Sequence, residues 1–352
     1  MVTAPSQQAS STDPGQGGSR PPLDDEDRHR QLTTREGWRR FTDEAATDLV
    51  VLTEPQWRRL AEDERTRYDE ERIDHHARLI VIATSAVRRI VTAGRRLTML
   101  NRHAISARRG LVVSGAAGTG KTTAITQLGK THELIDRQRH PGQTRIPTVF
   151  VTVPPAATAR MLAVEFARFL GIPVAPRQNI TDVTEAVCGV LCAARTGLVI
   201  VDEIHNLNLA TRSGAEVSDQ LKYFSERITA TFVYAGINVQ REGLFSGTRG
   251  QQIAGRFSMI PTVTFPYQQE WAAVVATLEQ ALRLHHHPIG SLVKLDRYLH
   301  QRTKGMIGSL SHLIRGSAIE AILDGTEQIT KQTLESIDLD YAATTTTLPD
   351  GR

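Results

Sequence analysis

A glycine-rich run, Gly115-Ala-Ala-Gly-Thr-Gly-Lys-Thr122, matches the pattern G-x-x-x-x-G-K-[ST] between an apolar run and a helical pattern. The glycines let the backbone curl so that its N–H groups and the start of the helix point at phosphate oxygens. Lys121 would reach the outer phosphates, and the Thr122 hydroxyl would hold Mg²⁺. We expect phosphates to bind along Gly115, Ala116, Ala117, Gly118, Thr119, Gly120, Lys121, Thr122 and Thr123.

Two carboxylates follow a second apolar run, Leu-Val-Ile-Val-Asp202-Glu203, about 80 residues downstream. Asp202 is in the position to help bind Mg²⁺, and Glu203 to polarise an attacking water. Alternatively, one of the two caps the helix that follows. Both motifs, in this order and on predicted strands, predict ATP and Mg²⁺ as cofactors and ATP hydrolysis as the activity.

Further polar residues follow in the same half of the chain. Asn238 comes after the apolar run TFVYAG, where it could contact the outer phosphate and the attacking water, or could simply form a turn. Arg249 and Arg256 precede the last predicted strand. Either could reach the nucleotide of a neighbouring subunit and stabilise charge in the transition state, or could lie on the surface.

The tetrad Asp202-Glu-Ile-His205 also resembles the DExH box of helicases. A processive helicase of that kind needs a second domain of similar size with its own motor motifs. Only helical patterns remain after residue 268, so we do not expect one.

Short apolar runs alternate with helical patterns from Leu111 onward, which is typical of a parallel sheet with crossover helices. The pattern changes after Pro266 to helices alone, which predicts a second, all-helical unit. The predicted strands are Leu111–Ser114, Thr148–Val153, Leu198–Val201, Thr231–Ala235 and Pro261–Phe265, and the predicted helices are 120–139, 159–170, 181–195, 214–228, 268–284, 292–303, 309–323 and 330–341.

The 352 residues, 40% of them apolar and 23% charged, are ordinary for a soluble globular chain and suggest two domains with tails. We expect no membrane span and no signal peptide, and therefore a cytoplasmic protein. The predicted organisation is a disordered tail at 1–34, a helical extension at 35–108, an α/β core at 109–267, a helical unit at 268–342 and a polar tail at 343–352.

Together these residues resemble an AAA+ ATPase: GAAGTGKT, LVIVDE, an Asn after the fourth strand, GRF before the fifth and a C-terminal helical lid. The resemblance implies a five-stranded parallel sheet in the order 5-1-4-3-2. Within that superfamily the chain is similar to the TniB/TnsC group of transposition ATPases over about residues 75 to 340. The features behind this are the helical extension, DEIHNLN, AGIN, and the lid segment TKGMIGSLSHLIRGSAIEAI followed by ITKQTLES.

The resemblance places Lys121 and Thr122 at the phosphates and metal, Asp202 on Mg²⁺ and Glu203 as catalytic base. It also suggests Asn238 as first sensor and Arg256 as arginine finger. Many AAA+ lids present an arginine to the nucleotide from a G-x-x-R turn. The matching stretch here, Gly305-Met-Ile-Gly308, lacks it, and Arg315 lies about two turns too late to replace it.

The family's task implies an ATP-dependent homo-oligomer, ring or filament, that engages target DNA and recruits a transposase or integrase partner. Residues 88–109 carry seven Arg and no acid, which favours weakly sequence-specific contact with a phosphate backbone, although a solvated helix face or nucleotide and subunit contacts would explain them as well. The alternatives are an initiator- or loader-type AAA+ protein in replication and a nucleotide-gated protein-interaction switch.

Overall fold

In the computed structural model, residues 31–44, 49–207, 212–239, 255–340 and 343 are described. Five parallel strands form one sheet in the order β2-β3-β4-β1-β5. Read from the other edge, this is the predicted order 5-1-4-3-2, and the predicted α/β fold is confirmed. The strands are β1 (Gly110–Gly115), β2 (Thr148–Thr152), β3 (Leu198–Asp202), β4 (Thr231–Gly236) and β5 (Phe257–Thr262).

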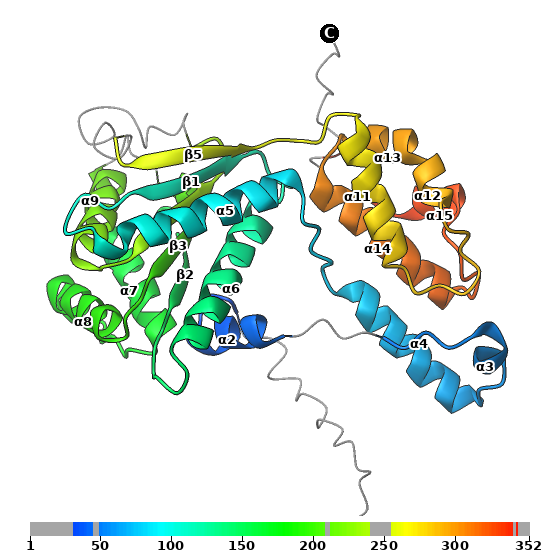
Figure 1. Ribbon diagram of the computed structural model, residues 1–352, viewed down its shortest axis with the longest axis horizontal. Coiled ribbons are helices and arrows are strands. Elements are labelled where there is room, and N and C mark those ends of the chain that lie inside the picture. Colours follow the sequence, from blue (N-terminus) through cyan, green and yellow to red (C-terminus); the bar gives the residue numbers. More distant parts are fainter. Residues whose placement is uncertain (1–30, 45–48, 208–211, 240–254, 341–342, 344–352) are drawn as a thin grey trace, which may run out of the picture.

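The central strands are continuous apolar runs because helices cover both faces of the sheet. Leu111, Val112 and Val113 of β1 are fully buried, as are residues 198–201 of β3. Figure 1 shows one layer of helices on each face of the sheet. One layer contains α5 (Ser85–Leu100) and α6 (Lys121–Arg139), and the other contains α7 (Ala159–Leu170), α8 (Ile180–Ala193) and α9 (Arg212–Arg227).

Several predicted elements differ from those observed, and the helices expected at 268–284 and 330–341 end earlier, at Gln280 and Ser336. The last strand was expected at 261–265, but β5 begins at Phe257 and pairs Pro261 with Ser114. A proline is tolerated here because β5 is an edge strand that is hydrogen-bonded on one side only. The helix expected at 292–303 is two short helices, α12 (Ser291–Lys294) and α13 (Asp296–Thr303), which meet at Leu295.

The C-terminal unit is a helical lid with a core of its own. Trp271, Leu299 and Leu310 are fully buried in it. None of the helices in the described parts of the chain is both long enough and apolar enough to cross a membrane. The lid contains α12 and α13 together with α11 (Gln269–Gln280), α14 (Ile307–Leu323) and α15 (Lys331–Ser336).

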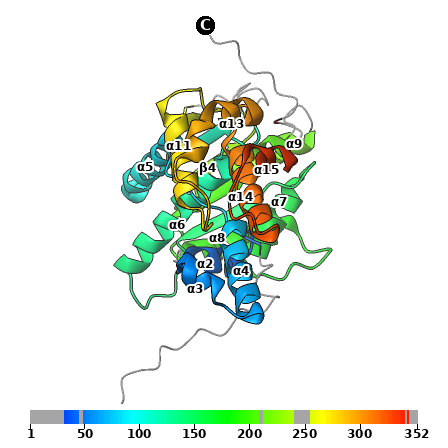
Figure 2. The same cartoon turned by 90° about the vertical axis from the view of Figure 1, so that its right-hand side faces the viewer.

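The N-terminal helices divide between the two units. The helix α2 (Arg35–Asp43) packs on α6 of the core, where Trp38 stacks on Phe150 with 5.7 Å between ring centroids. The helix α4 (Glu62–Ala77) instead packs against α14 of the lid (Figures 1 and 2). The short helix α3 (Glu54–Arg58) contacts the C-terminal unit through Trp57, which stacks on His285 with 4.4 Å between ring centroids. A short linker, residues 78–84, then leads from α4 to α5 of the core.

A buried ion pair joins α4 to the lid. The Arg72 guanidinium is fully buried and donates to both carboxylate oxygens of Glu327, at 2.6 and 2.8 Å. It also donates to the Arg283 carbonyl at 3.2 Å and pairs with Asp69. Such bidentate geometry offsets the cost of desolvating both charges only while both partners are present.

Replacing Arg72 with Met should destabilise the chain, because Glu327 would remain buried without its counter-charge. Breaking a buried pair in this way typically costs about 3–5 kcal/mol, so we expect a clear fall in Tm in thermal unfolding. Arg58→Met, which breaks the exposed pair with Glu54 on α3, is the control and should leave Tm almost unchanged. Equally small effects of both substitutions would show that the buried pair does not hold α4 to the lid.

Candidate functional site

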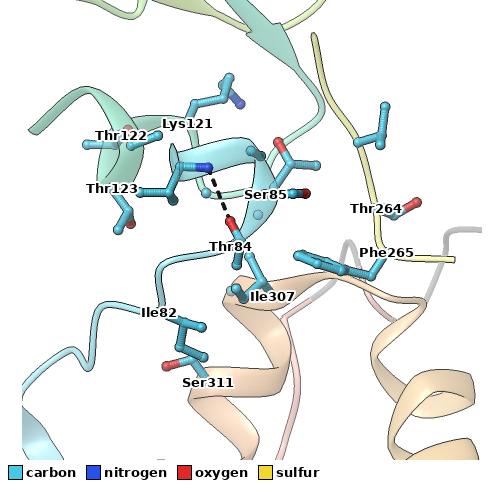
Figure 3. Close-up of a pocket in the computed structure, with 18 of the residues that line it drawn as sticks. Ile82, Thr84, Ser85, Lys121, Thr122, Thr123, Thr264, Phe265, Ile307 and Ser311 are labelled. Carbon is cyan, nitrogen blue, oxygen red and sulfur yellow. Dashed lines mark hydrogen bonds between the residues drawn. The ribbon is translucent and has the colours of Figure 1, made fainter. Parts of the chain in front are cut away.

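A cavity of about 700 Å³ lies where the sheet, the linker before α5 and the lid meet. Figure 3 shows the side chains that point into it from these segments. The run 117–124 after β1 forms one wall, and residues 79–87 form another. The end of β5 and the loop after it, together with the start of α14, close the remaining sides.

The glycine-rich run connects the end of β1 to α6 in the way its residues predict. Gly118 and Gly120 have φ values of 72° and 82°, which side chains rarely adopt, and Gly120 is the N-cap residue of α6. Gly115 lies so close to β5 that an added Cβ would be 2.2 Å from the Thr262 carbonyl oxygen. The glycines therefore permit the tight curve that this run adopts beside β5.

The predicted metal ligands meet although they are 80 residues apart in the chain. The Thr122 hydroxyl donates to Oδ2 of Asp202 at 2.8 Å, while Oδ1 accepts from the Glu203 N–H at 2.8 Å. Asp202 is buried, and this burial raises the pKa of its carboxyl. Lys121 is buried too, which lowers the pKa of its ammonium group, and it donates to the Ala116 carbonyl at 2.7 Å. A cation and a polyanion are the ligands that would satisfy this arrangement.

Glu203 borders the cavity in a left-handed conformation, with φ 58° and ψ 34°. Non-glycine residues adopt this conformation at a cost, and such residues cluster at functional sites. Its Oε2 lies 3.3 Å from Nε2 of His205. The Ile237 N–H donates to Nδ1 of the same ring at 3.3 Å, so Nε2 carries the proton in the neutral form and can donate to Glu203. The sequence had suggested His205 only through the helicase box.

Two further predicted residues are not among those that line the cavity, and they differ in how near to it they lie. Ile237 lines it, but Asn238, with φ 44°, is not among the described lining residues. The turn at Asn238 is held to β1 by Val239, whose N–H donates to the Ser114 hydroxyl at 3.0 Å. Arg256 lies at the amino ends of the strands, immediately before β5 and away from the cavity. Its guanidinium group is 3.6 Å from the carboxylate of Glu226. The alternative finger, Arg249, lies outside the described residues.

The lid reaches the glycine-rich run through its backbone, at the position where an arginine is missing. The Gly308 N–H donates to the Gly118 carbonyl at 3.0 Å, and an added Cβ at Gly308 would lie 3.2 Å from that oxygen. Arg315 does not replace the missing arginine. It donates to the His76 carbonyl at 2.7 Å and to that of Ala77, and so holds the end of α4.

Apolar residues line the part of the cavity between the linker and the lid, and no sequence motif points to them. Ile82 comes from the linker, Phe265 from the loop after β5 and Ile307 from the lid (Figure 3). Beside them, the buried Ser311 hydroxyl has no hydrogen-bond partner among the described residues. Apolar walls with a few polar groups are typical of pockets that hold a flat organic group. No short motif marks these residues, because they come from three distant segments.

Comparison with known families identifies the chain. The family model described as "Bacterial TniB protein" matches residues 72–267, more than half of the sequence. The chain belongs to the TniB family. With the observed sheet order and the glycine-rich run, this makes the protein a P-loop ATPase of the AAA+ type. No curated protein sequence matches this TniB-family chain.

Solved structures with the same fold include ORC proteins of Aeropyrum pernix. The ORC2 protein in its ADP form is 16% identical, with a TM-score of 0.59 over 77% of this chain and 72% of that one. The ORC2 protein in its ADPNP–ADP complexes is 14% identical, with a TM-score of 0.55 over 74% and 69%. The ORC1 protein in complex with DNA is 16% identical, with a TM-score of 0.53 over 72% and 63%. At these identities the likeness shows the fold alone.

Gly308→Ala should weaken nucleotide binding several-fold, because the added methyl group would push the lid away from Gly118. Isothermal titration with a non-hydrolysable ATP analogue would measure the change in Kd. Gly189→Ala on α8 is the matched control, since no atom lies within 4 Å of a Cβ added there. Alanine is the better helix former, so this control should bind normally and gain up to about 1 kcal/mol of stability. Unchanged affinity in Gly308→Ala would contradict the importance of this contact.

Proposed function

We propose that this TniB-family protein binds and hydrolyses ATP in the cavity between core and lid, as part of an ATP-dependent regulator of DNA transposition. The observation that carries the nucleotide assignment is the hydrogen bond between Thr122 and Asp202 beside the glycine-rich run. In this proposal the phosphates lie along residues 115–123, with Lys121 turned toward them. The base lies between Ile82, Phe265 and Ile307.

The residues at the end of β3 fit a magnesium ion. The hydroxyl oxygen of Thr122 and the carboxylate of Asp202 are hard oxygen ligands, which Mg²⁺ prefers together with phosphate oxygens. Bound there, the ion would neutralise charge that develops on the phosphates. It would also stabilise the ionised form of Asp202, whose pKa burial raises.

Glu203 is proposed to orient and polarise the water that attacks the outermost phosphate. Its left-handed backbone places it at the cavity wall, and the ring of His205 holds its carboxylate at 3.3 Å. His205 is thereby a positioning residue, and it links Glu203 to the end of β4 through Ile237. Asn238 follows in that turn and is proposed as the sensor of the phosphate.

We propose an oligomer with ATP between subunits because the cavity and Arg256 lie at opposite ends of the strands. The cavity lies where the strands end, and Arg256 lies where β5 begins. Arg256 is therefore badly placed to serve its own cavity and well placed to serve that of a neighbouring subunit. A guanidinium supplied in this way stabilises the charge of the transition state.

Target DNA and a transposase or integrase are the proposed partners. The match to the TniB family favours transposition. The likeness to ORC proteins, one of them described in complex with DNA, keeps a replication initiator or loader as the second candidate. A nucleotide-gated protein switch is the third, favoured by the lid that meets the glycine-rich run through Gly308 instead of an arginine.

Glu203→Gln should lower ATP turnover by at least about 100-fold, because a positioned general base typically contributes that much or more. Binding of ATP should persist, since Lys121, Thr122 and Asp202 remain. The measurement is phosphate release with and without duplex DNA at two salt concentrations, with oligomer size followed by light scattering. We expect DNA to change turnover or assembly, and we expect its effect to fade as salt rises.

The control for the loss of one carboxylate charge is Glu165→Gln, which alters the partner of Arg168 on α7. This variant should leave turnover unchanged. Wild-type protein whose turnover and assembly ignore DNA would overturn the transposition proposal and favour the protein switch.

Arg256→Ala should lower turnover about 1000-fold, the scale typical of arginine fingers, while the Kd for ATP stays the same. Mixing this variant with Lys121→Ala, itself inactive, should restore part of the activity. In the mixture an intact cavity of one variant can meet the intact Arg256 of the other. Arg177→Ala, at an exposed position on the core, is the control and should behave like the wild type. Failure of the two inactive variants to complement each other would argue against Arg256 acting between subunits.

A further inference from the structure

A second hollow, of about 670 Å³, lies at the amino ends of the strands. Gly197 before β3 and Thr231 at the start of β4 line it, together with the ends of α5 and α6. The hollow and the nucleotide cavity are therefore at opposite ends of the strands. We call it the arginine hollow, after the six arginines that line it: Arg95, Arg102, Arg108, Arg139, Arg145 and Arg195.

Positive charge dominates the arginine hollow. The carboxylate of Asp136 is the one acid among its described lining residues, and it pairs with Arg145 at 2.9 Å. No described carboxylate lies within ion-pair distance of the other five arginines. The Nε of Arg108 is buried and has no hydrogen-bond partner in the described part of the chain. These guanidinium groups are left available for an anion.

The arginine hollow also divides the cluster that the sequence had suggested at residues 88–109. Arg88 donates to the Ala83 carbonyl, and Arg89 lines the nucleotide cavity. Three other arginines of the cluster lie in the hollow instead, where they join three arginines from segments farther along the chain. The tertiary structure thus replaces one linear cluster with a concave site of different composition.

We infer that the arginine hollow binds the phosphodiester backbone of duplex DNA, an inference that rests on the proposed function. Guanidinium groups bind phosphate oxygens bidentately, and several from separate segments match a polymer of phosphates better than a single small anion. No Phe, Tyr or Trp is among the described residues of the arginine hollow, so base stacking has no platform there. Binding there is led by the backbone and tolerant of sequence.

The test is the triple variant Arg102→Ala, Arg139→Ala and Arg195→Ala in the full chain. All three side chains are exposed and have no ion pair with a described residue, so the fold should survive. Fluorescence anisotropy with a labelled duplex and a non-hydrolysable ATP analogue would measure the Kd over a range of salt. Each lost phosphate contact removes about 0.9 from the slope of log K against log salt. We expect the slope to fall by about 2 to 3 and the affinity at low salt by at least about 10-fold.

The matched control is the triple variant Arg59→Ala, Arg177→Ala and Arg297→Ala. It removes the same charge from exposed positions that do not line the hollow, and it should keep the wild-type slope. Substituting lysine instead of alanine at the three hollow positions should restore most of the slope, because phosphate contacts need the charge first. The Kd for the nucleotide, whose proposed site lies at the carboxyl ends of the strands, should be the same in all variants.

Equal DNA binding by the hollow and control triples would overturn this inference, while DNA binding by the wild type would still support the proposed function. Loss of ATP-dependent assembly in the hollow triple, with DNA binding lost only as its consequence, would overturn it too and assign the hollow to subunit contacts. Wild-type protein that binds no duplex would instead overturn the proposed function itself.

Discussion

All strands of the sheet run in one direction. Residues that follow the strands therefore gather at the carboxyl ends of the strands, and residues that precede them gather at the amino ends. This constraint brings Thr122 to Asp202 across β4 and places Ile237 beside His205. It also places Arg256 at the opposite end of the strands, away from the cavity of its own chain. The arginine hollow lies at that opposite end as well. The parallel sheet thereby separates the proposed site of hydrolysis from the proposed DNA-binding site.

The lid and the linker complete what the sheet begins. The segments that follow β1 and β3 supply the charged half of the cavity. The linker, the loop after β5 and α14 supply the apolar half. Because α4 is tied to the lid by Arg72 and Arg315, and the linker follows α4 directly, the two apolar walls belong to one mechanical unit. The backbone contact between Gly308 and Gly118 joins that unit to the glycine-rich run. In the proposed function, this contact would couple nucleotide binding to the position of the lid without a lid arginine.

Short local signals predicted much of the fold and of the charged half of the site. The glycine-rich run and the LVIVDE strand each carry their chemistry within a few consecutive residues, so their position was readable from the sequence. The start of β5 was not, because Pro261 reads as a strand breaker until its place at the sheet edge is known. The apolar half of the cavity was missed because Ile82, Phe265 and Ile307 resemble ordinary core residues.

The sequence by itself determined the fold class, the strand order through family resemblance, and the identity of Lys121, Thr122, Asp202 and Glu203 as a group. Consecutive residues must be neighbours, and a strand followed by a glycine-rich turn and a helix has few ways to fold. Only the tertiary structure decided that the ring of His205 lies 3.3 Å from the Glu203 carboxylate and that the arginines of residues 88–109 divide between two cavities. Contacts between segments far apart in the chain depend on how the layers pack, and no local pattern records that packing.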